Sequence, residues 1–262
     1  MGARYNDATP QSRKHAPMCR LSVNLNKIAL LRNSRTTGVP DVAAFARHVH
    51  AAGAHGITIH PRPDQRHIRH ADVAALAAAI AHWRPSFEYN IEGRPDAEFM
   101  QLVDSVRPEQ CTLVPDAYDV LTSDEGWKLS PRQVALLRPV VAQLKAWGCR
   151  AILFLDPDAA QVALAPQTGA DGVEFYTGGY AADFRRGTHA VSLAAHAKAA
   201  AAAQALGLVA NAGHDLTTRN IPPYLQACPH IAEMSIGHEL TADALAIGFD
   251  AAVKAYLAAM GS

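Results

Sequence analysis

The stretch GITIHPRPDQRHIRHADVAALAAAIAHWRPSFEYNIE, residues 56–92, has the pattern of a strand, a helix and a second strand in turn. GITIH, residues 56–60, is a short β-rich run that leads into a polar segment. ADVAALAAAIAHW, residues 71–83, is rich in Ala, which favours a helix. SFEYNIE, residues 86–92, alternates polar and apolar side chains as a strand does. The stretch therefore predicts one strand–helix–strand unit of a parallel sheet.

The same alternation continues along the rest of the chain, where Gly repeatedly marks the change from a helix to the next strand. Further strands are expected at residues 21–28, 111–115, 151–156, 172–176, 208–213 and 231–236, and further helices at residues 41–53, 96–106, 132–148, 191–207 and 239–260. Eight such units in about 240 residues are typical of a single-domain α/β fold, the (β/α)8 TIM barrel, here over residues 20–262. An open doubly wound parallel sheet is the structural alternative.

Composition narrows the possible partners and compartment. The chain has 262 residues, 49% of them hydrophobic, and a formal net charge of zero, so neither a nucleic-acid surface nor a membrane-binding face is expected. Cys19, Cys111, Cys149 and Cys228 form no CxxC pair, which favours reduced thiols in a cytoplasmic protein. Residues 1–19 are polar, without the apolar core of a secretion signal, and are expected to form a flexible N-terminal arm.

Polar residues lie where the predicted strands end. In a barrel these ends meet at one mouth, which is where active sites of this fold occur. Each residue alone is explained equally well as a capping or solvated group, but together they combine carboxylates, imidazoles and guanidinium groups. The strand-end candidates are Asn24, Asn26, Lys27, His60, Arg62, Glu92, Thr122, Asp156, Glu174, Tyr176, Asn211, His214, Gly237 and His238.

The segments around residues 60 and 92 leave two interpretations open. His60 and Arg62 lie on the same side of an extended segment, which favours a joint role over a buried structural histidine. Arg66 is expected on a solvated charged face. Glu88, Asn90 and Glu92 share one face of their strand; if that face points into the barrel, burial raises the pKa of Glu92 and suits it to acid/base catalysis, and if it points outward Glu92 is surface.

The segment SIGHEL, residues 235–240, precedes a helix and offers backbone N–H groups at the helix N-terminus. In a barrel the loops after the seventh and eighth strands form the usual phosphate site. A Gly-His pair is weak evidence alone, and its position makes it a phosphate-site candidate.

A set of motifs lies along the chain from about residue 20 to the C-terminus: SVNLNKIALLRNSR, GITIHPRPDQRHI, YNIEG, TLVPD followed by LTSDEGW, GADGVEFYTGGYA, LGLVANAGHDLT and SIGHEL. Through these motifs the chain resembles the pyridoxine 5′-phosphate synthase family of vitamin B6 biosynthesis. The resemblance implies a (β/α)8 barrel that assembles into a homo-octamer and uses neither a metal nor an organic cofactor. It implies that 1-deoxy-D-xylulose 5-phosphate and 3-amino-2-oxopropyl phosphate are joined into pyridoxine 5′-phosphate, with release of phosphate and water.

The resemblance also assigns roles. It implies that His60 and Glu92 accept protons, that His214 donates one, and that Glu174 has a supporting acid/base role. The substrate-binding residues that it implies are Arg62, His67 and Thr122 for the sugar phosphate, and Asn24, Arg35, Gly237 and His238 for the amino-ketone phosphate.

The chain departs from the commonest family pattern at two places. It has Asn26 and Lys27 where that pattern has Asp-His, and Asp215 where Gly usually follows the catalytic His. We expect Lys27 to offer a cation to the sugar substrate, as in an Asn-Lys subfamily, and we place Asn26 and Asp215 at the same site.

Three other functions remain open from the residues alone. The first is a different phosphate-handling barrel enzyme, an isomerase or an aldolase. The second is a barrel that binds a phosphorylated ligand without catalysis. The third is a metallohydrolase, which the sequence disfavours because no HxH follows the first strand and the histidine spacings are poor.

Overall fold

The strands close into one barrel, in chain order and parallel to one another. The computed structural model describes residues 18–115 and 125–261. The strands are β1 (Arg20–Asn24), β2 (Gly56–Ile59), β3 (Glu88–Gly93), β4 (Gln110–Leu113), β5 (Arg150–Leu155), β6 (Gly172–Tyr176), β7 (Val209–Gly213) and β8 (Ile231–Ile236). β1 pairs with both β2 and β8, so the predicted (β/α)8 barrel is confirmed and the open sheet is excluded.

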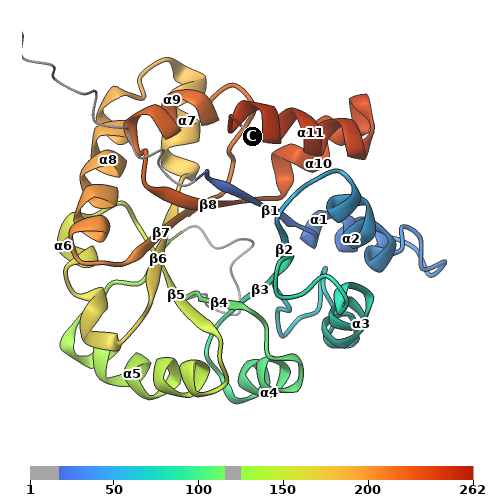
Figure 1. Cartoon of the computed structure of the whole chain (residues 1–262), viewed down its shortest axis with the longest axis horizontal. Helices are drawn as coiled ribbons and strands as arrows, with labels where there is room; N and C mark the ends of the chain where they lie inside the picture. The colour runs from blue at the N-terminus through green and yellow to red at the C-terminus, as the bar shows by residue number, and fades with distance from the viewer. Residues whose placement is uncertain (1–17, 116–124, 262) are drawn as a thin grey trace, which may run out of the picture.

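The helices lie outside the strands, as Figure 1 shows. They are α1 (Asn26–Asn33), α2 (Val42–Ala51), α3 (His70–Ile80), α4 (Ala97–Val106), α5 (Pro131–Ala146), α6 (Ala159–Val162), the 3-10 helix η1 (Ala165–Thr168), α7 (Gly178–Arg186), α8 (Ala190–Ala205), α9 (Ile221–Ala227), α10 (His238–Ile247) and α11 (Phe249–Ala259). The predicted starts at Asp41 and Asp96 are confirmed, because each carboxylate accepts a hydrogen bond from a backbone N–H of the helix that follows.

Two predicted elements were wrong in extent. The strand expected over residues 21–28 ends at Asn24, because the side chain of Asn24 accepts a hydrogen bond from the Asn26 backbone N–H and turns the chain into α1. The helix expected over residues 239–260 is two helices. Gly248 separates α10 from α11, with a φ of 86° that only glycine adopts readily.

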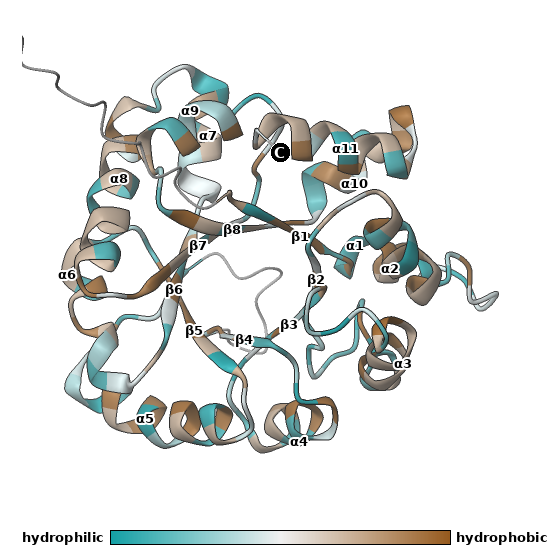
Figure 2. Ribbon diagram, viewed as in Figure 1, coloured by the Kyte–Doolittle hydropathy of each residue, from teal (hydrophilic) through white to brown (hydrophobic). Residues whose placement is uncertain are grey.

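The barrel interior is polar, whereas the layer between strands and helices is apolar. Hydrogen bonds cross the interior between strands that are not neighbours, from Thr112 on β4 to Glu174 on β6 and from Gln110 on β4 to Glu233 on β8. Alternate residues of the same strands, such as Tyr89 and Ile91, are fully buried against the helices. Figure 2 shows the resulting mixture of apolar and hydrophilic segments along the strands and along helices such as α5.

The face of β3 that carries Glu88, Asn90 and Glu92 points into the barrel. Asn90 donates a hydrogen bond to Thr58 on β2 at 3.3 Å, and Asn24 on β1 donates one to Glu92 at 3.4 Å. Of the two orientations that the sequence left open, the structure therefore has the inward one, and Glu92 is only 5% exposed.

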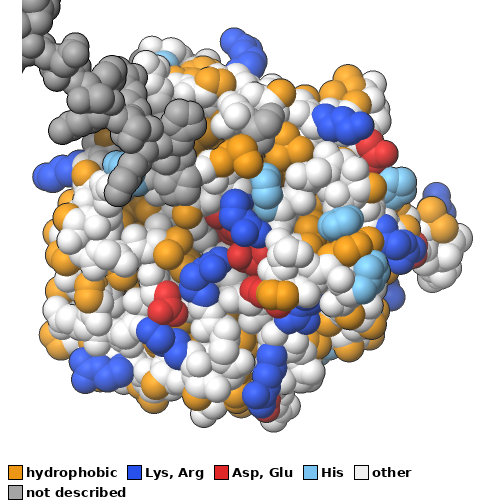
Figure 3. All heavy atoms as spheres, viewed as in Figure 1, with side chains coloured by type: hydrophobic (Ala, Val, Ile, Leu, Met, Phe, Trp, Pro, Cys, Tyr) orange, Lys and Arg blue, Asp and Glu red, His pale blue; other side chains and the backbone are white. Residues whose placement is uncertain are grey.

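A charged cluster occupies the interior at the beginnings of the strands. Arg150 pairs with Glu88 at 2.6 Å, and Gln110 donates a hydrogen bond to Glu233 at 3.0 Å. Burial, together with the nearby Glu88 carboxylate, raises the pKa of Glu233 well above its usual value. Figure 3 shows Lys, Arg, Asp and Glu side chains together over the middle of the barrel on the face that it draws.

The cysteines, the N-terminal segment and the helix lengths bear on the predictions about compartment. All four cysteines are buried and free, as their spacing predicted. Residues 1–17 of the predicted N-terminal arm lie outside the described residues. No helix within residues 18–115 or 125–261 combines the length and the apolar character needed to cross a bilayer.

Candidate active site

A cavity of about 590 Å³ opens where the strands end, a volume in the usual range for a small-molecule site. Its wall combines residues from β1, β2, β3, β6, β7 and β8 and from the segments that follow them. The predicted site residues that line it are Asn24, Asn26, Lys27, His60, Arg62, His67, Glu92, His214, Asp215, Gly237 and His238.

Among the candidates that the structure describes, Arg35, Asp156, Glu174 and Asn211 do not line the cavity. Arg35 is exposed, in the segment after α1, and Glu174 is buried inside the barrel. Thr122 lies outside the described residues.

The wall also contains Tyr176, one of the strand-end candidates, and three residues that the sequence did not single out as site residues: Leu30, Arg66 and Ser235. Ser235 was within reach of prediction, because it lies on β8 two residues before the candidate Gly237. Arg66, expected on a solvated face, lines the cavity while its side chain pairs with Asp64.

The turn between β1 and α1 contacts the ends of three other strands, β2, β3 and β8, at the mouth of the barrel. Asn26 accepts a hydrogen bond from the backbone N–H of His60 at 2.9 Å, so the start of α1 holds the end of β2. Asn24 accepts from the Asn26 backbone with its oxygen and donates to Glu92 with its nitrogen. Gly237 at the end of β8 lies so close to Asn24 that an added Cβ would stand 3.0 Å from the Asn24 Cβ. These contacts bring β1, β2, β3 and β8 together around Glu92.

One side of the cavity is cationic. Lys27, Arg62, Arg66 and His67 all line it. Burial, together with the charges of Arg62 and Lys27, lowers the pKa of His67 to about 4, so its imidazole is neutral near pH 7. The Nδ1 atom of His67 accepts a hydrogen bond from the Ile68 backbone N–H at 2.9 Å, which leaves the proton on Nε2. This side therefore offers guanidinium, ammonium and imidazole N–H donors, the groups that bind phosphate.

His60 lies beside this cationic side. Its ring centroid is 6.1 Å from that of His67, and it is 6% exposed. Burial lowers the pKa of His60 well below its usual value, and repulsion from the protonated forms of His67 and His214 and from the Arg62 guanidinium acts in the same direction. The neutral imidazole that results is able to accept a proton, and a phosphate dianion bound nearby would raise its basicity by opposing these charges.

Glu174 lies within the barrel, next to the end of β7. A Cβ added to Gly213 would stand 2.4 Å from the Glu174 Oε1 atom, so glycine is needed for the carboxyl group to lie there. Burial raises the pKa of Glu174 from 4.5 to about 7, against the effect of a hydrogen bond from Thr112. A carboxyl group with a pKa near neutrality is able to act as an acid or as a base.

The raised pKa of Glu174 makes the stability of the protein depend on pH. Between about pH 4.5 and pH 7 the folded protein holds a proton on Glu174 that the unfolded chain has released, so the free energy of unfolding falls as pH rises through this window. We expect Glu174→Gln to reduce this fall by about 1–3 kcal/mol, because a Gln side chain does not titrate. Urea unfolding at pH 5 and pH 8 measures the difference.

Glu125→Gln is the control for this prediction, because Glu125 is exposed. It should leave the fall in stability between pH 5 and pH 8 as in the wild type. If Glu174→Gln retains the full wild-type fall, Glu174 is already ionised in the folded protein at the lower pH.

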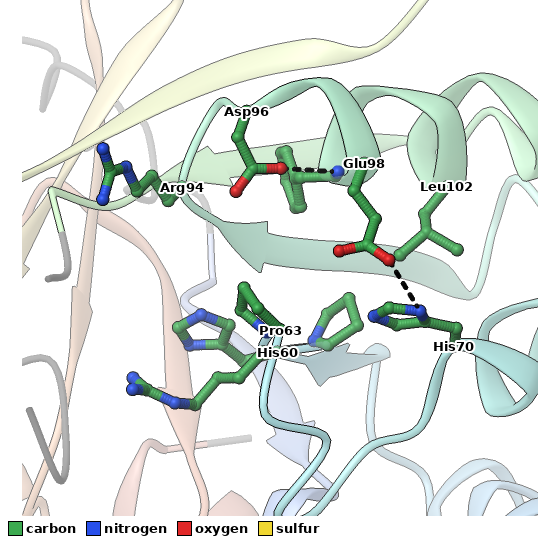
Figure 4. A pocket seen from close by; sticks show the side chains of 10 residues that line it. His60, Pro63, His70, Arg94, Asp96, Glu98 and Leu102 are labelled. Atoms are coloured by element: carbon green, nitrogen blue, oxygen red, sulfur yellow. Dashed lines mark hydrogen bonds and ion pairs between the residues drawn. The ribbon is translucent and has the colours of Figure 1, made fainter. Parts of the chain in front are cut away.

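A smaller hollow lies behind His60 and Arg62, between the segment after β2 and the start of α4. Figure 4 shows His60 and Pro63 on one side of it and Arg94 and Asp96 on the other. His70 at the start of α3 pairs with Glu98 on α4 at 3.3 Å. The contact joins α3 to α4 behind the segment that carries His60, and so supports the wall of the cavity.

Within residues 18–115 and 125–261, no group of three or more His, Cys, Asp or Glu side chains has the arrangement needed to hold a metal ion. The histidines that line the cavity lie instead among Lys, Arg and Asn side chains.

Comparison with known proteins places the chain in a family. Residues 21–262 match the family model described as Pyridoxal phosphate biosynthesis protein PdxJ. The chain belongs to the PdxJ family. A curated pyridoxine 5'-phosphate synthase of Porphyromonas gingivalis is 46% identical over 239 residues, which cover 91% of this chain and 98% of that protein. The pyridoxine 5'-phosphate synthase of Albidiferax ferrireducens is 49% identical over 243 residues, which cover 91% of this chain and 96% of that protein.

Solved structures of low identity confirm the fold alone. A tryptophan synthase of M. tuberculosis in its aminoacrylate-bound form matches with a TM-score of 0.62 and 12% identity, covering 93% of this chain and 94% of that one. The YdjI aldolase of Escherichia coli K12 matches with a TM-score of 0.56 and 11% identity, covering 93% of this chain and 89% of that one.

The backbone explains one departure of this PdxJ-family chain from the commonest pattern of its relatives. Asp215, which stands where Gly is usual, has a φ of 57°, in the left-handed region. Asp and Asn enter that region more readily than other side chains, so Asp is tolerated where Gly would be unstrained. The carboxylate then becomes part of the cavity wall.

Proposed function

We propose that this PdxJ-family chain joins 3-amino-2-oxopropyl phosphate to 1-deoxy-D-xylulose 5-phosphate and closes the pyridine ring of pyridoxine 5′-phosphate, with release of phosphate and water. One observation carries the proposal: a single cavity contains His60, Glu92 and His214 together with a cationic side. Acid/base groups next to an anion site are what a condensation of two phosphorylated substrates requires.

The reaction is a series of proton transfers. The amine of one substrate adds to the ketone of the other and loses water to form an imine. Phosphate is then eliminated, and an aldol-like closure with further loss of water gives the aromatic ring. Each well-placed acid or base contributes about 10²–10⁴-fold to such steps, and holding two substrates together contributes an entropic advantage.

We assign the proton acceptors to His60 and Glu92 and the proton donor to His214. The neutral state of His60 and the position of Glu92 at the end of β3, 5% exposed, support the first assignment. His214 lies across the mouth, after β7, and Glu174 lies within the barrel beside Gly213 as a supporting acid or base.

We assign two phosphate sites to the side chains and backbone N–H groups that line the cavity. Arg62 and His67 bind the sugar phosphate, with Thr122 as a further ligand predicted from the family. Gly237 and His238 at the start of α10 bind the amino-ketone phosphate with Asn24. No side chain caps the first turn of α10, so its backbone N–H groups point to a ligand site. Arg35, which is exposed, remains a predicted ligand of this second phosphate.

Replacing Lys27 tests whether the cationic side of the cavity binds the sugar phosphate. It lines the cavity, and its charge contributes to the lowered pKa of His67, so it lies near the proposed sugar-phosphate site. We expect Lys27→Ala to raise the KM for the sugar phosphate about tenfold, because one charge-assisted contact contributes about 1.5 kcal/mol. Steady-state kinetics with the other substrate saturating measures it.

Two variants control this measurement. Lys27→Arg keeps the charge and should stay near the wild-type KM. Lys198→Ala removes an exposed cation on α8 and should change nothing. An unchanged KM for Lys27→Ala would place that side chain outside the substrate contact.

The proposed activity is tested by mixing chelator-treated protein with both substrates and following pyridine-ring absorbance and phosphate release together. Equal amounts of ring and phosphate support the proposal and a reaction without a metal. Phosphate without a ring indicates a different reaction, such as that of an isomerase or aldolase. Neither signal indicates a barrel that binds phosphorylated ligands only.

Assembly and location are proposed from the family resemblance. We propose a homo-octamer in the cytoplasm, with no nucleic-acid or membrane partner. Light scattering of the purified protein measures the assembly, and a mass other than that of eight chains contradicts it.

A further inference from the structure

The backbone that carries His214 is strained. His214 has a φ of 84° and Asp215 a φ of 57°, so two consecutive side-chain-bearing residues lie in the left-handed region. Each such residue costs on the order of 1–3 kcal/mol, and the conformation persists only where the surrounding structure holds it. The contacts that hold this segment therefore set the position of the His214 imidazole.

Thr177 provides the closest of these contacts. Its backbone N–H donates to the Gly213 carbonyl at 2.9 Å, and its hydroxyl contacts the same carbonyl at 2.6 Å and also the His214 carbonyl. The residue is fully buried. Thr177 thus binds the two carbonyls that lead into the strained residues.

The hydroxyl of Thr177 does not cap the helix that it precedes. Thr177 is the N-cap residue of α7, a position where a Thr side chain usually accepts a hydrogen bond from a backbone N–H of the helix. Here no side-chain cap bond is made. The hydroxyl contacts the end of β7 instead, so its loss affects the His214 segment rather than the start of α7.

α7 also holds the far side of the segment. Tyr180 donates from its hydroxyl to the Asn220 carbonyl at 2.8 Å, and the Asn220 side chain donates to the Asp215 carbonyl at 3.3 Å. The carbonyls of residues 213, 214 and 215 are therefore all bound. The His214 ring itself packs against Phe154 and Tyr176, with ring centroids 5.3 Å apart in both pairs.

We infer that Thr177 is a positioning residue for the reaction: its hydroxyl holds His214 in the left-handed conformation that directs the imidazole to the substrates. The inference rests on the proposed function, in which His214 donates a proton. Thr177 does not line the cavity and does not touch substrate. Its contribution is to kcat, because a displacement of about 1 Å at a reacting group costs up to 10²-fold in rate.

The test compares Thr177→Val, which keeps the shape and removes the hydroxyl, with Thr177→Ser, which keeps the hydroxyl. We expect Thr177→Val to lower kcat about 10–100-fold with the KM of both substrates within threefold of the wild type. Thr177→Ser should restore kcat to within about threefold. Steady-state kinetics of both variants, with thermal melting in parallel, provides the readouts.

Thr168→Val is the matched control. Thr168 is buried in η1, before β6 and at the opposite end of the barrel, and its hydroxyl donates to the Ala165 carbonyl at 2.7 Å. The control should lower the melting temperature and leave kcat unchanged. Tyr180→Phe is the second variant in case Thr177→Val does not fold; it removes only the bond to Asn220 and should lower kcat about 2–10-fold without raising KM.

Each outcome decides the inference. A wild-type kcat in Thr177→Val, or in Tyr180→Phe where Thr177→Val does not fold, overturns it while leaving the proposed function in place. A Thr177→Ser variant as slow as Thr177→Val also overturns it, since the hydroxyl is then not what matters. A wild type that forms no pyridine ring removes the proposed function and the inference with it.

Discussion

Replacing Glu92 with Gln lowers kcat by about 10²–10⁴-fold in the reaction that we propose, because an amide of the same shape cannot accept a proton. Glu92 is 5% exposed and accepts a hydrogen bond from Asn24 at 3.4 Å, a contact that a Gln oxygen also makes. In the site that we propose, Arg62 and His67 bind the sugar phosphate, so its affinity should remain within about threefold of the wild type. Steady-state kinetics and calorimetric titration of the sugar phosphate measure the two quantities.

Asp104→Asn is the control for this result, since Asp104 on α4 keeps its carboxylate exposed and outside the cavity. It should turn over as the wild type does. If Glu92→Gln also turns over at the wild-type rate, Glu92 takes no part in proton transfer. If it loses sugar-phosphate binding as well as turnover, Glu92 acts in binding the substrate instead.

Those parts of the fold that depend on local pattern followed from the sequence. The bounds of β6 and β8 agree with the expected runs at residues 172–176 and 231–236. The strands also predicted where the site would form, because parallel strands of a closed barrel must end at one mouth. That rule and the positions of the strand ends were enough to predict that His60, Glu92 and His214 lie in one cavity.

The rest depends on contacts between segments distant in sequence. The end of β1 is set by an Asn side chain that turns the chain, and no apolar pattern records that. The position of Arg35 outside the cavity follows from the path of the chain after α1, which strand ends do not determine. The left-handed conformation of His214 depends on Thr177, 37 residues earlier in the chain. Tertiary hydrogen bonds, rather than local propensity, decide these features.

Arg32 and Asp72 form a contact of this kind, and breaking it should have the largest effect on stability. Arg32 on α1 donates two hydrogen bonds to Asp72 on α3, at 2.5 Å and 2.7 Å, with side chains only 11% and 15% exposed. It also donates to the His67 carbonyl at 3.1 Å. The pair therefore joins α1 and α3 to the segment that we propose to bind the sugar phosphate.

Replacing Arg32 with Ala leaves the Asp72 carboxylate largely buried without its cation, a change that costs about 3–5 kcal/mol. In a domain of this size the melting temperature should fall by roughly 6–20 °C. The His67 carbonyl loses a donor at the same time, so the KM for the sugar phosphate should rise in the protein that remains folded. Urea unfolding and kinetics at low temperature measure the two effects.

Arg186→Ala provides the contrast, because Arg186 pairs with Asp183 at the surface with its side chain 67% exposed. A surface pair of this kind contributes little to stability, because water and salt screen the two charges. The double variant Arg32→Ala with Asp72→Ala should be more stable than the sum of the single changes predicts, because it removes the isolated carboxylate as well. If Arg32→Ala costs no more than Arg186→Ala, water already solvates Asp72 and the pair does not hold α1 to α3.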